Sequence, residues 1–66
     1  MTKIANSDYI IINVNNNGCG YIWLENNEYE CSRENAEGMV RAARMNGYRE
    51  VAWQRHENGD QTYWFN

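Results

Sequence analysis

The stretch at residues 32–47, SRENAEGMVRAARMNG, decides the fold, because it is the only segment that the sequence marks unambiguously as a helix. Ser32 is a good N-cap, since its hydroxyl can accept hydrogen bonds from the free amides of the first turn. Gly47 supplies the left-handed residue that commonly ends a helix. We therefore predict a helix over residues 33–46, with a β-hairpin on either side of it.

The two sides of this helix differ in character. Small and apolar residues recur on one side at the spacing i, i+3, i+4 and i+7, which predicts that this side packs closely on a sheet. These residues are Ala36, Met39, Val40 and Ala43. The other side carries Gly38, Arg41 and Met45, where long solvated side chains are the usual choice. That side is either a tolerated imperfection or a second candidate docking face.

The remaining segments read as strands and turns. Residues 9–14 and 19–24 are predicted strands around an Asn-rich turn that ends at Gly18, and residues 28–31 could add a short third strand before the helix. Residues 48–56 and 61–65 are predicted strands around an Asn58–Gly59 turn. We expect one α+β domain over residues 1–66, with ββαββ order. Its single antiparallel sheet has four strands, or five, and one face is covered by the helix.

The register of the first hairpin decides which side chains share a face. A register with Gly18 in a left-handed bulge gives one wholly aliphatic face, which suits a helix with a small-residue stripe. Ile10, Ile12 and Val14 then face the same way as Gly20, Ile22 and Leu24, and Tyr9, Ile11, Tyr21 and Trp23 take the other face. In the last hairpin the same reasoning groups Val51 with Trp53, Tyr63 and Phe65, and Glu50 with Ala52, Gln54, Thr62 and Trp64.

Composition narrows the functional classes. The formal net charge is −3, from 6 Lys and Arg against 9 Asp and Glu, so direct binding of nucleic acid is not expected. Residues 1–8 lack the apolar run of a signal peptide, and no segment is apolar over enough length to span a bilayer, which predicts a cytoplasmic protein. Cys19 and Cys31 are then expected to be thiols. With His56 they do not approach the ligand spacing of a zinc site, so we predict no metal and no cofactor.

A catalytic site is also not expected. His56 lies beside a hairpin turn with Glu57 adjacent to it in sequence, and adjacent residues of a strand point to opposite faces. No other nucleophile, base or glycine-rich phosphate loop has a spacing that implies proximity. We therefore predict that the protein is not an enzyme.

Function is more plausibly carried by the sheet face that the helix leaves open. Aromatic residues assigned to that face are typical of a binding surface, and a small acidic cluster lies at one edge of it. The predicted partner-binding residues are Tyr9, Tyr21, Trp23 and Trp64 with Glu25, Glu28 and Glu30. Three alternatives stay open: the rings belong to the core, they stack single-stranded nucleic acid, or the open faces of two copies bury each other in a homodimer.

In length, acidity, absence of Pro and expected ββαββ layout, the chain resembles the small inhibitor proteins that phages encode, of which anti-CRISPR proteins are the best-known class. The likeness spans the whole chain and rests on no motif. It implies a stoichiometric inhibitor that binds and blocks a host defence protein in the host cytoplasm. Aromatic anchors would supply affinity and charge would supply specificity. If that host protein binds nucleic acid, the carboxylates would stand in for phosphates.

Overall fold

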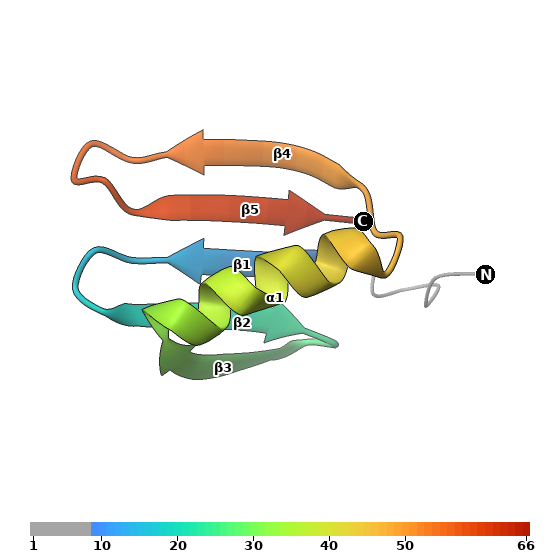
Figure 1. Cartoon of the computed structure of the whole chain (residues 1–66), viewed down its shortest axis with the longest axis horizontal. Helices are drawn as coiled ribbons and strands as arrows, with labels where there is room; N and C mark the ends of the chain where they lie inside the picture. The colour runs from blue at the N-terminus through green and yellow to red at the C-terminus, as the bar shows by residue number, and fades with distance from the viewer. Residues whose placement is uncertain (1–8) are drawn as a thin grey trace.

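The computed structural model describes residues 9–66, which form one antiparallel sheet and one helix (Figure 1). The elements in chain order are β1 (Ile10–Val14), β2 (Cys19–Leu24), β3 (Asn27–Ser32), α1 (Arg33–Met45), β4 (Glu50–Arg55) and β5 (Gln61–Phe65). The five strands lie in the order β3-β2-β1-β5-β4. The predicted α+β class with a single sheet is confirmed. The predicted ββαββ order is wrong, because three strands precede the helix and the order is βββαββ.

The third strand is longer than the sequence indicated because the turn before it is tighter. Glu25 and Asn26 adopt φ values of 52° and 66°, and Leu24 pairs directly with Asn27. Two successive left-handed residues make the type I′ turn that closes a two-residue hairpin. Pairing therefore starts at Asn27 and continues to Ser32, so a full edge strand runs directly into the helix.

The first hairpin adopts the bulged register that the sequence favoured. The Asn15 amide donates to the Cys19 carbonyl over 3.0 Å, and Gly18 has a φ of 90°. Ile12 then lies opposite Ile22, as predicted. The last hairpin repeats this geometry at Gly59, where φ is 94°. The two tips lie side by side because β1 and β5 are paired, with Val14 opposite Gln61.

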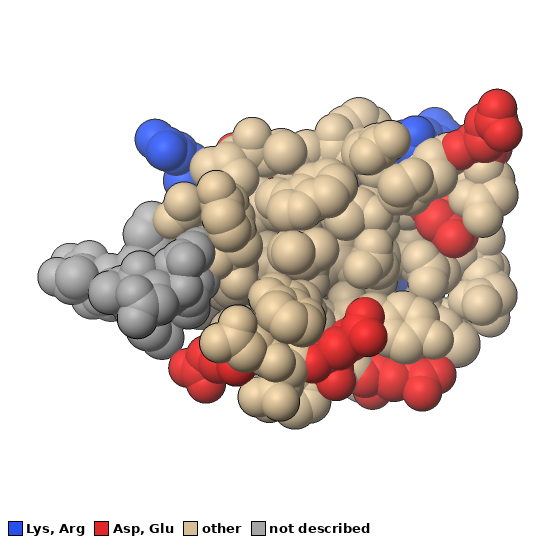
Figure 2. Space-filling model, turned by 180° about the vertical axis from the view of Figure 1, so that it is seen from behind, with Lys and Arg blue, Asp and Glu red and all other residues tan. Residues whose placement is uncertain are grey.

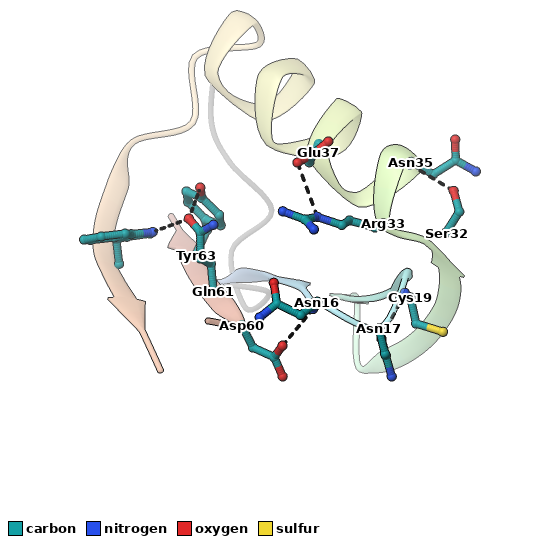
Figure 3. A network of polar contacts seen from close by, with 11 residues as sticks. Asn16, Asn17, Cys19, Ser32, Arg33, Asn35, Glu37, Asp60, Gln61 and Tyr63 are labelled. Atoms are coloured by element: carbon teal, nitrogen blue, oxygen red, sulfur yellow. Dashed lines mark hydrogen bonds and ion pairs between the residues drawn. The ribbon is translucent and has the colours of Figure 1, made fainter. Parts of the chain in front are cut away.

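The hairpin tips are tied together by polar contacts. The Asn16 amide donates to Asp60 Oδ1 over 2.8 Å (Figure 3), and the Asn16 side chain donates to the Asn58 carbonyl. These bonds join the β1–β2 connection to the β4–β5 connection, whose strands are neighbours only through β1 and β5. The contact holds the two hairpins in one sheet at the end remote from the C-terminus (Figure 1).

The helix begins where its sequence predicts and ends one residue earlier than predicted, because Asn46 is its C-cap. The Ser32 hydroxyl accepts from the Asn35 amide over 3.1 Å (Figure 3), and the helix stops at Met45, before Gly47 at a φ of 86°. Its stripe of Ala36, Val40 and Ala43 is buried against the sheet. The other buried apolar residues are Ile10, Ile12, Val14 and Phe65. The small-residue stripe thus faces the aliphatic side of the sheet, as expected.

The closest approach of helix and sheet is at Gly20. A β-carbon built on Gly20 would lie 2.5 Å from the Ala36 β-carbon and 3.0 Å from the Asn13 carbonyl oxygen, so only glycine fits there. The helix packs on β1, β2 and β3, which is where it lies in Figure 1, and β4 is left at the far edge of the sheet. All six residues of β4 are consequently exposed.

A β-bulge in β4 corrects two predicted positions. Glu50 lies opposite Phe65 and Ala52 lies opposite Trp64, so Val51 is the extra residue between them. Glu50 therefore lies on the helix side, where its Oε1 is 2.7 Å from Arg44 Nη2. Val51 joins Ala52 along a shallow groove on the open side. Strict alternation of side chains along the strand predicted Glu50 on the open side and Val51 on the helix side, because it takes no account of a bulge.

Candidate functional site

The face of the sheet away from the helix, here called the open face, carries a row of apolar side chains across the strands. Ile11 of β1 pairs with Trp23 of β2 on one side and with Trp64 of β5 on the other. Ala52 of β4 extends the row beyond Trp64, and Glu28 of β3 ends it beside Trp23. Directly paired residues point to the same face, so these five side chains line up as one band. We call this band the tryptophan row.

The tryptophan row is accessible rather than covered. Trp23 retains 38% of its surface in contact with solvent, and Tyr9, which precedes β1, retains 46%. Tyr9, Ile11 and Trp64 line a shallow groove with Val51 and Ala52, so the apolar surface continues from the centre of the sheet to β4. Figure 2 shows the centre of this face as a broad area without charged side chains. Exposed rings at the centre of an apolar patch are typical of a binding surface.

A second row, parallel to the first, is polar. It places Glu30, Tyr21, Asn13, Thr62 and Gln54 side by side across all strands. This part of the open face is more polar, and its side chains provide the hydrogen-bonding groups that could orient a bound partner.

The centre of the polar row is held by a hydrogen-bonded chain of Asn13, Thr62 and His56. The Thr62 hydroxyl, on a residue only 4% exposed, donates to Asn13 Oδ1 over 2.7 Å. Since that hydroxyl has one proton, it accepts from His56 Nε2, which lies 2.7 Å away. The proton of a neutral His56 is thereby placed on Nε2. This series of hydrogen bonds satisfies the buried Thr62 hydroxyl and holds in place the polar residues that lie beside the tryptophan row.

The acidic edge occupies the β3 side of the open face. Glu28 lies opposite Trp23 and Glu30 lies opposite Tyr21, so each carboxylate is beside an aromatic ring. Figure 2 shows acidic side chains along the edge that β3 forms. The pKa of the Tyr21 phenol is raised, chiefly by the negative charge of Glu30, then by partial burial and by the charges of Cys19 and Glu28. Tyr21 therefore lies within the field of both carboxylates.

The structure brings together most of the predicted partner-binding residues. Tyr21, Trp23 and Trp64 share the open face with Glu28 and Glu30. Tyr9 lies at the start of β1 beside Trp64, in the shallow groove. Glu25 lies outside the rows, in the turn between β2 and β3, where its carboxylate adds to the charge at the end of the acidic edge. Neither Trp23 nor Trp64 belongs to the buried core.

The second candidate face is divided. Gly38 and Arg41 of the helix line a shallow groove together with Ile22 of β2 and Cys31 of β3. Met45, the last residue of the helix, is 86% exposed and does not line this groove. The three residues therefore do not form one surface.

Sequence reasoning missed two parts of the open face. Val51 is turned onto it by the bulge, for which the sequence carries no signal. The polar chain through Thr62 joins Asn13 of β1, Thr62 of β5 and His56, the residue after β4, and only strand order makes Asn13 and Thr62 neighbours. A threonine in an otherwise aromatic strand was the one available hint.

The side chains with chemical reactivity are dispersed. Within residues 9–66, no three His, Cys, Asp or Glu side chains gather in a way that could hold a metal ion. Cys19 pairs with Ser32 and Cys31 pairs with Gly20, so the two thiols are on opposite faces of the sheet. Burial, followed by the charges of Cys19 and Glu30, raises the pKa of the Cys31 thiol. Across the same residues, the helix lacks the length and apolar character needed to cross a membrane.

Comparison with known proteins gives no relative. No protein-family model matches the chain, and neither does any curated protein or solved structure. The likeness to phage inhibitors therefore stays a prediction.

Proposed function

We propose that this chain is a non-enzymatic protein-binding domain, and that its open face binds a partner protein whose surface is basic. The observation that carries the proposal is the tryptophan row, in which Trp23, Ile11 and Trp64 lie side by side and Glu28 ends the row. Tryptophan and tyrosine are enriched among the residues that dominate binding energy, and their rings offer a large apolar area with few rotatable bonds.

The charge at the edge of this surface favours a basic partner. Glu28 lies directly beside the exposed ring of Trp23 and Glu30 beside the half-buried ring of Tyr21, so a Lys or Arg of the partner could contact a ring face and a carboxylate together. Carboxylates at the rim of an interface also speed association with a positively charged protein and reject acidic ones. The same carboxylates oppose phosphates, which disfavours stacking of single-stranded nucleic acid on these rings.

An inhibitory role is consistent with this surface. A chain of 66 residues that covers a basic groove on a larger protein would block that groove at a ratio of one to one. If the groove normally holds nucleic acid, Glu25, Glu28 and Glu30 would take the place of phosphates. We therefore propose a phage-type inhibitor of a host defence protein, acting in the host cytoplasm, as the biological setting of the binding surface.

The proposal is tested by affinity capture with matched variants. The tagged chain is incubated with a host lysate treated with nuclease, and retained proteins are compared for the native chain, Trp23→Ala and Trp53→Ala. Trp53 is the matched control, since it is also an exposed tryptophan in a strand and, although it borders the shallow groove, its ring nitrogen donates to Gln61 on the helix side. We expect the native chain and Trp53→Ala to retain the same protein, and Trp23→Ala to lose at least about fivefold in affinity, or roughly 1 kcal/mol.

Two further measurements make the result decisive. Circular dichroism of Trp23→Ala must match that of the native chain, and unfolding of this variant would contradict the assignment of Trp23 to a binding surface. A double variant with Glu28→Gln and Glu30→Gln should bind more slowly and with a weaker dependence on salt. The capture is repeated with lysate that has not been treated with nuclease, and retention of nucleic acid there, with no specific protein retained in either lysate, would refute the proposal and favour base stacking.

A further inference from the structure

The two edges of the sheet are protected against pairing to very different degrees. The Leu24–Asn27 pair closes a two-residue hairpin, so the backbone N–H and C=O groups of Leu24 and Asn27 bond each other. Bonded and non-bonded pairs alternate along an antiparallel pair of strands, so the backbone groups of Glu28 and Glu30 are directed outward, away from β2. Any strand that approached the middle of β3 would meet a carboxylate at two successive free backbone sites, those of Glu28 and Glu30. Charged side chains of this kind are a common protection of an edge strand.

The edge formed by β4 lacks this protection over part of its length. The His56 amide donates to the Asp60 carbonyl over 2.8 Å, and Gln54 lies opposite Thr62. By the alternation of an antiparallel pair, the N–H and C=O groups of Trp53 and Arg55 therefore point away from β5. These two residues offer a short free edge with no carboxylate on either of them.

This edge is also bare on both sides. The helix packs on β1, β2 and β3, so it does not cover the ring of Trp53, which is 50% exposed. Trp53 lies opposite Tyr63, and its Nε1 donates to Gln61 Oε1, which also accepts from the Tyr63 hydroxyl (Figure 3). The ring is thus held in place beside the free edge, on the helix side. On the open side Val51 is 40% exposed.

We propose that β4 pairs with β4 of a second copy of this chain, antiparallel and around a two-fold axis at Gln54. In this register the outward groups of Trp53 meet those of Arg55 of the second copy, and the reverse pair forms by symmetry. Each edge supplies both donors and acceptors, so an identical copy is the partner that satisfies all four positions. The two sheets become one continuous sheet.

The side chains fit the same register. Residues directly opposite each other in an antiparallel pair share a face, so the guanidinium of Arg55 lies beside the Trp53 ring of the second copy, a favourable pairing of a cation with an aromatic face. The bulge at Val51 lies outside the paired residues and limits the contact to the end of β4 near the hairpin tip. The carboxylates on β3 prevent a third copy from joining at the other edge, so the assembly closes as a dimer.

The paired residues of the dimer lie apart from the main anchors of the proposed partner binding. The pairing uses Trp53 and Arg55 of β4, whereas Trp23, Glu28 and Glu30 lie on β2 and β3 toward the other edge of the sheet. A dimer would present two open faces on the same side of one sheet, so that a partner with two basic sites is bound by both copies.

Sedimentation of the purified chain over a concentration series, from about 1 µM to about 1 mM, tests the mass, and amide hydrogen exchange tests the contact. We expect the mass to rise from 7.8 kDa to twice that value. The amides of Trp53 and Arg55 should become protected with the same concentration dependence, whereas the Gln54 amide, bonded within the chain, should be protected throughout. A chain that stays monomeric over the series would overturn the proposal. So would a dimer in which the Trp53 and Arg55 amides exchange as fast as in the monomer.

Variants separate this proposal from the partner-binding one. Trp53→Lys places a cation opposite Arg55 of the second copy. We expect this variant to raise the dissociation constant of the dimer at least tenfold while its circular dichroism spectrum is unchanged. Trp23→Lys is the matched control, and it should lose partner capture but keep the dimer. If Trp23→Lys dissociates the dimer and Trp53→Lys does not, the copies meet through their open faces and the β4 pairing is refuted.

Discussion

Substitution of Gly20 by Ala should destabilise the fold, because this position sets the distance between helix and sheet. The added β-carbon would lie 2.5 Å from the Ala36 β-carbon and 3.0 Å from the Asn13 carbonyl oxygen. Carbon atoms pack at about 3.5–4.0 Å, so the helix would have to retreat by roughly 1 Å. Neither atom belongs to the end of a flexible side chain that could turn away.

The expected cost follows from overpacking in a thin core. Such changes cost about 1–3 kcal/mol. For a domain of this size a change of 1 kcal/mol shifts the melting temperature by about 4–8 °C, so Gly20→Ala should lower it by roughly 5–20 °C. Urea titration followed by circular dichroism gives the free energy of unfolding directly.

Gly38→Ala is the matched control, since it makes the same chemical change in the helix. A β-carbon at Gly38 would meet only Arg41 Nη2 at 3.7 Å, an ordinary contact. Helix propensity then favours Ala by up to about 1 kcal/mol, so this variant should be more stable than the native chain. Opposite signs for the two variants are the prediction. A neutral or stabilised Gly20→Ala would contradict the close approach of the helix at Gly20.

Three further predictions concern the open face and the thiols. Glu30→Gln should lower the pKa of Tyr21, because the charge of Glu30 is the largest cause of its rise, and a tyrosine-resolved NMR titration would detect the change. Since the raised pKa disfavours the phenolate in the folded state, stability should fall as the pH rises through about 10, the value in the unfolded chain, and fall less in the variant. Thr62→Val should cost about 1–3 kcal/mol in urea titration, as it leaves the two partners of a buried hydroxyl unpaired, and an unchanged midpoint would show that water replaces it. Mild oxidation of the folded chain should give no bond between Cys19 and Cys31, which point to opposite faces, and mass spectrometry after alkylation should find both thiols.

The sequence predicted those parts of the fold that depend on local periodicity. The helix stripe repeats at helical spacing, and the cap at Ser32 and the glycine at 47 bound it on both sides. The first register was predictable too, because only one of the two choices gives an even aliphatic face for the helix to cover. In each case one pattern and one packing requirement agree.

The turn before β3 and the bulge in β4 could not be predicted, because each is a backbone choice without its usual residue. A type I′ turn normally has Asn or Gly at its first position, and Glu25 is neither. The bulge at Val51 has no glycine to mark it. Both features depend on tertiary context, since each lets an edge strand meet its neighbour in a register that the rest of the sheet has set.

The candidate site was predictable as a face but not as a row. Alternation assigned Trp23 and Trp64 to the same side, yet their distance depends on which strands are neighbours. Only the placement of β1 between β2 and β5 puts Ile11 between the two rings and makes one continuous band. Strand order is fixed by pairing between segments far apart in the chain, for which a single sequence carries no direct signal.

The position of the helix on the sheet explains why both proposed surfaces are exposed. Because Gly20 lies in β2, the close approach that it permits draws the helix over the β1–β3 half of the sheet. A single helix of 13 residues cannot also cover β4, so Trp53 stays exposed on the helix side. The open face, meanwhile, has no second helix among residues 9–66 to cover it, and its tryptophans remain accessible. Widening the Gly20 contact should therefore loosen the helix without altering the tryptophan row, whose residues are positioned by strand pairing alone. Partner capture by Gly20→Ala at a temperature where it is folded should match that of the native chain, and a loss would mean that the helix contributes to the binding surface.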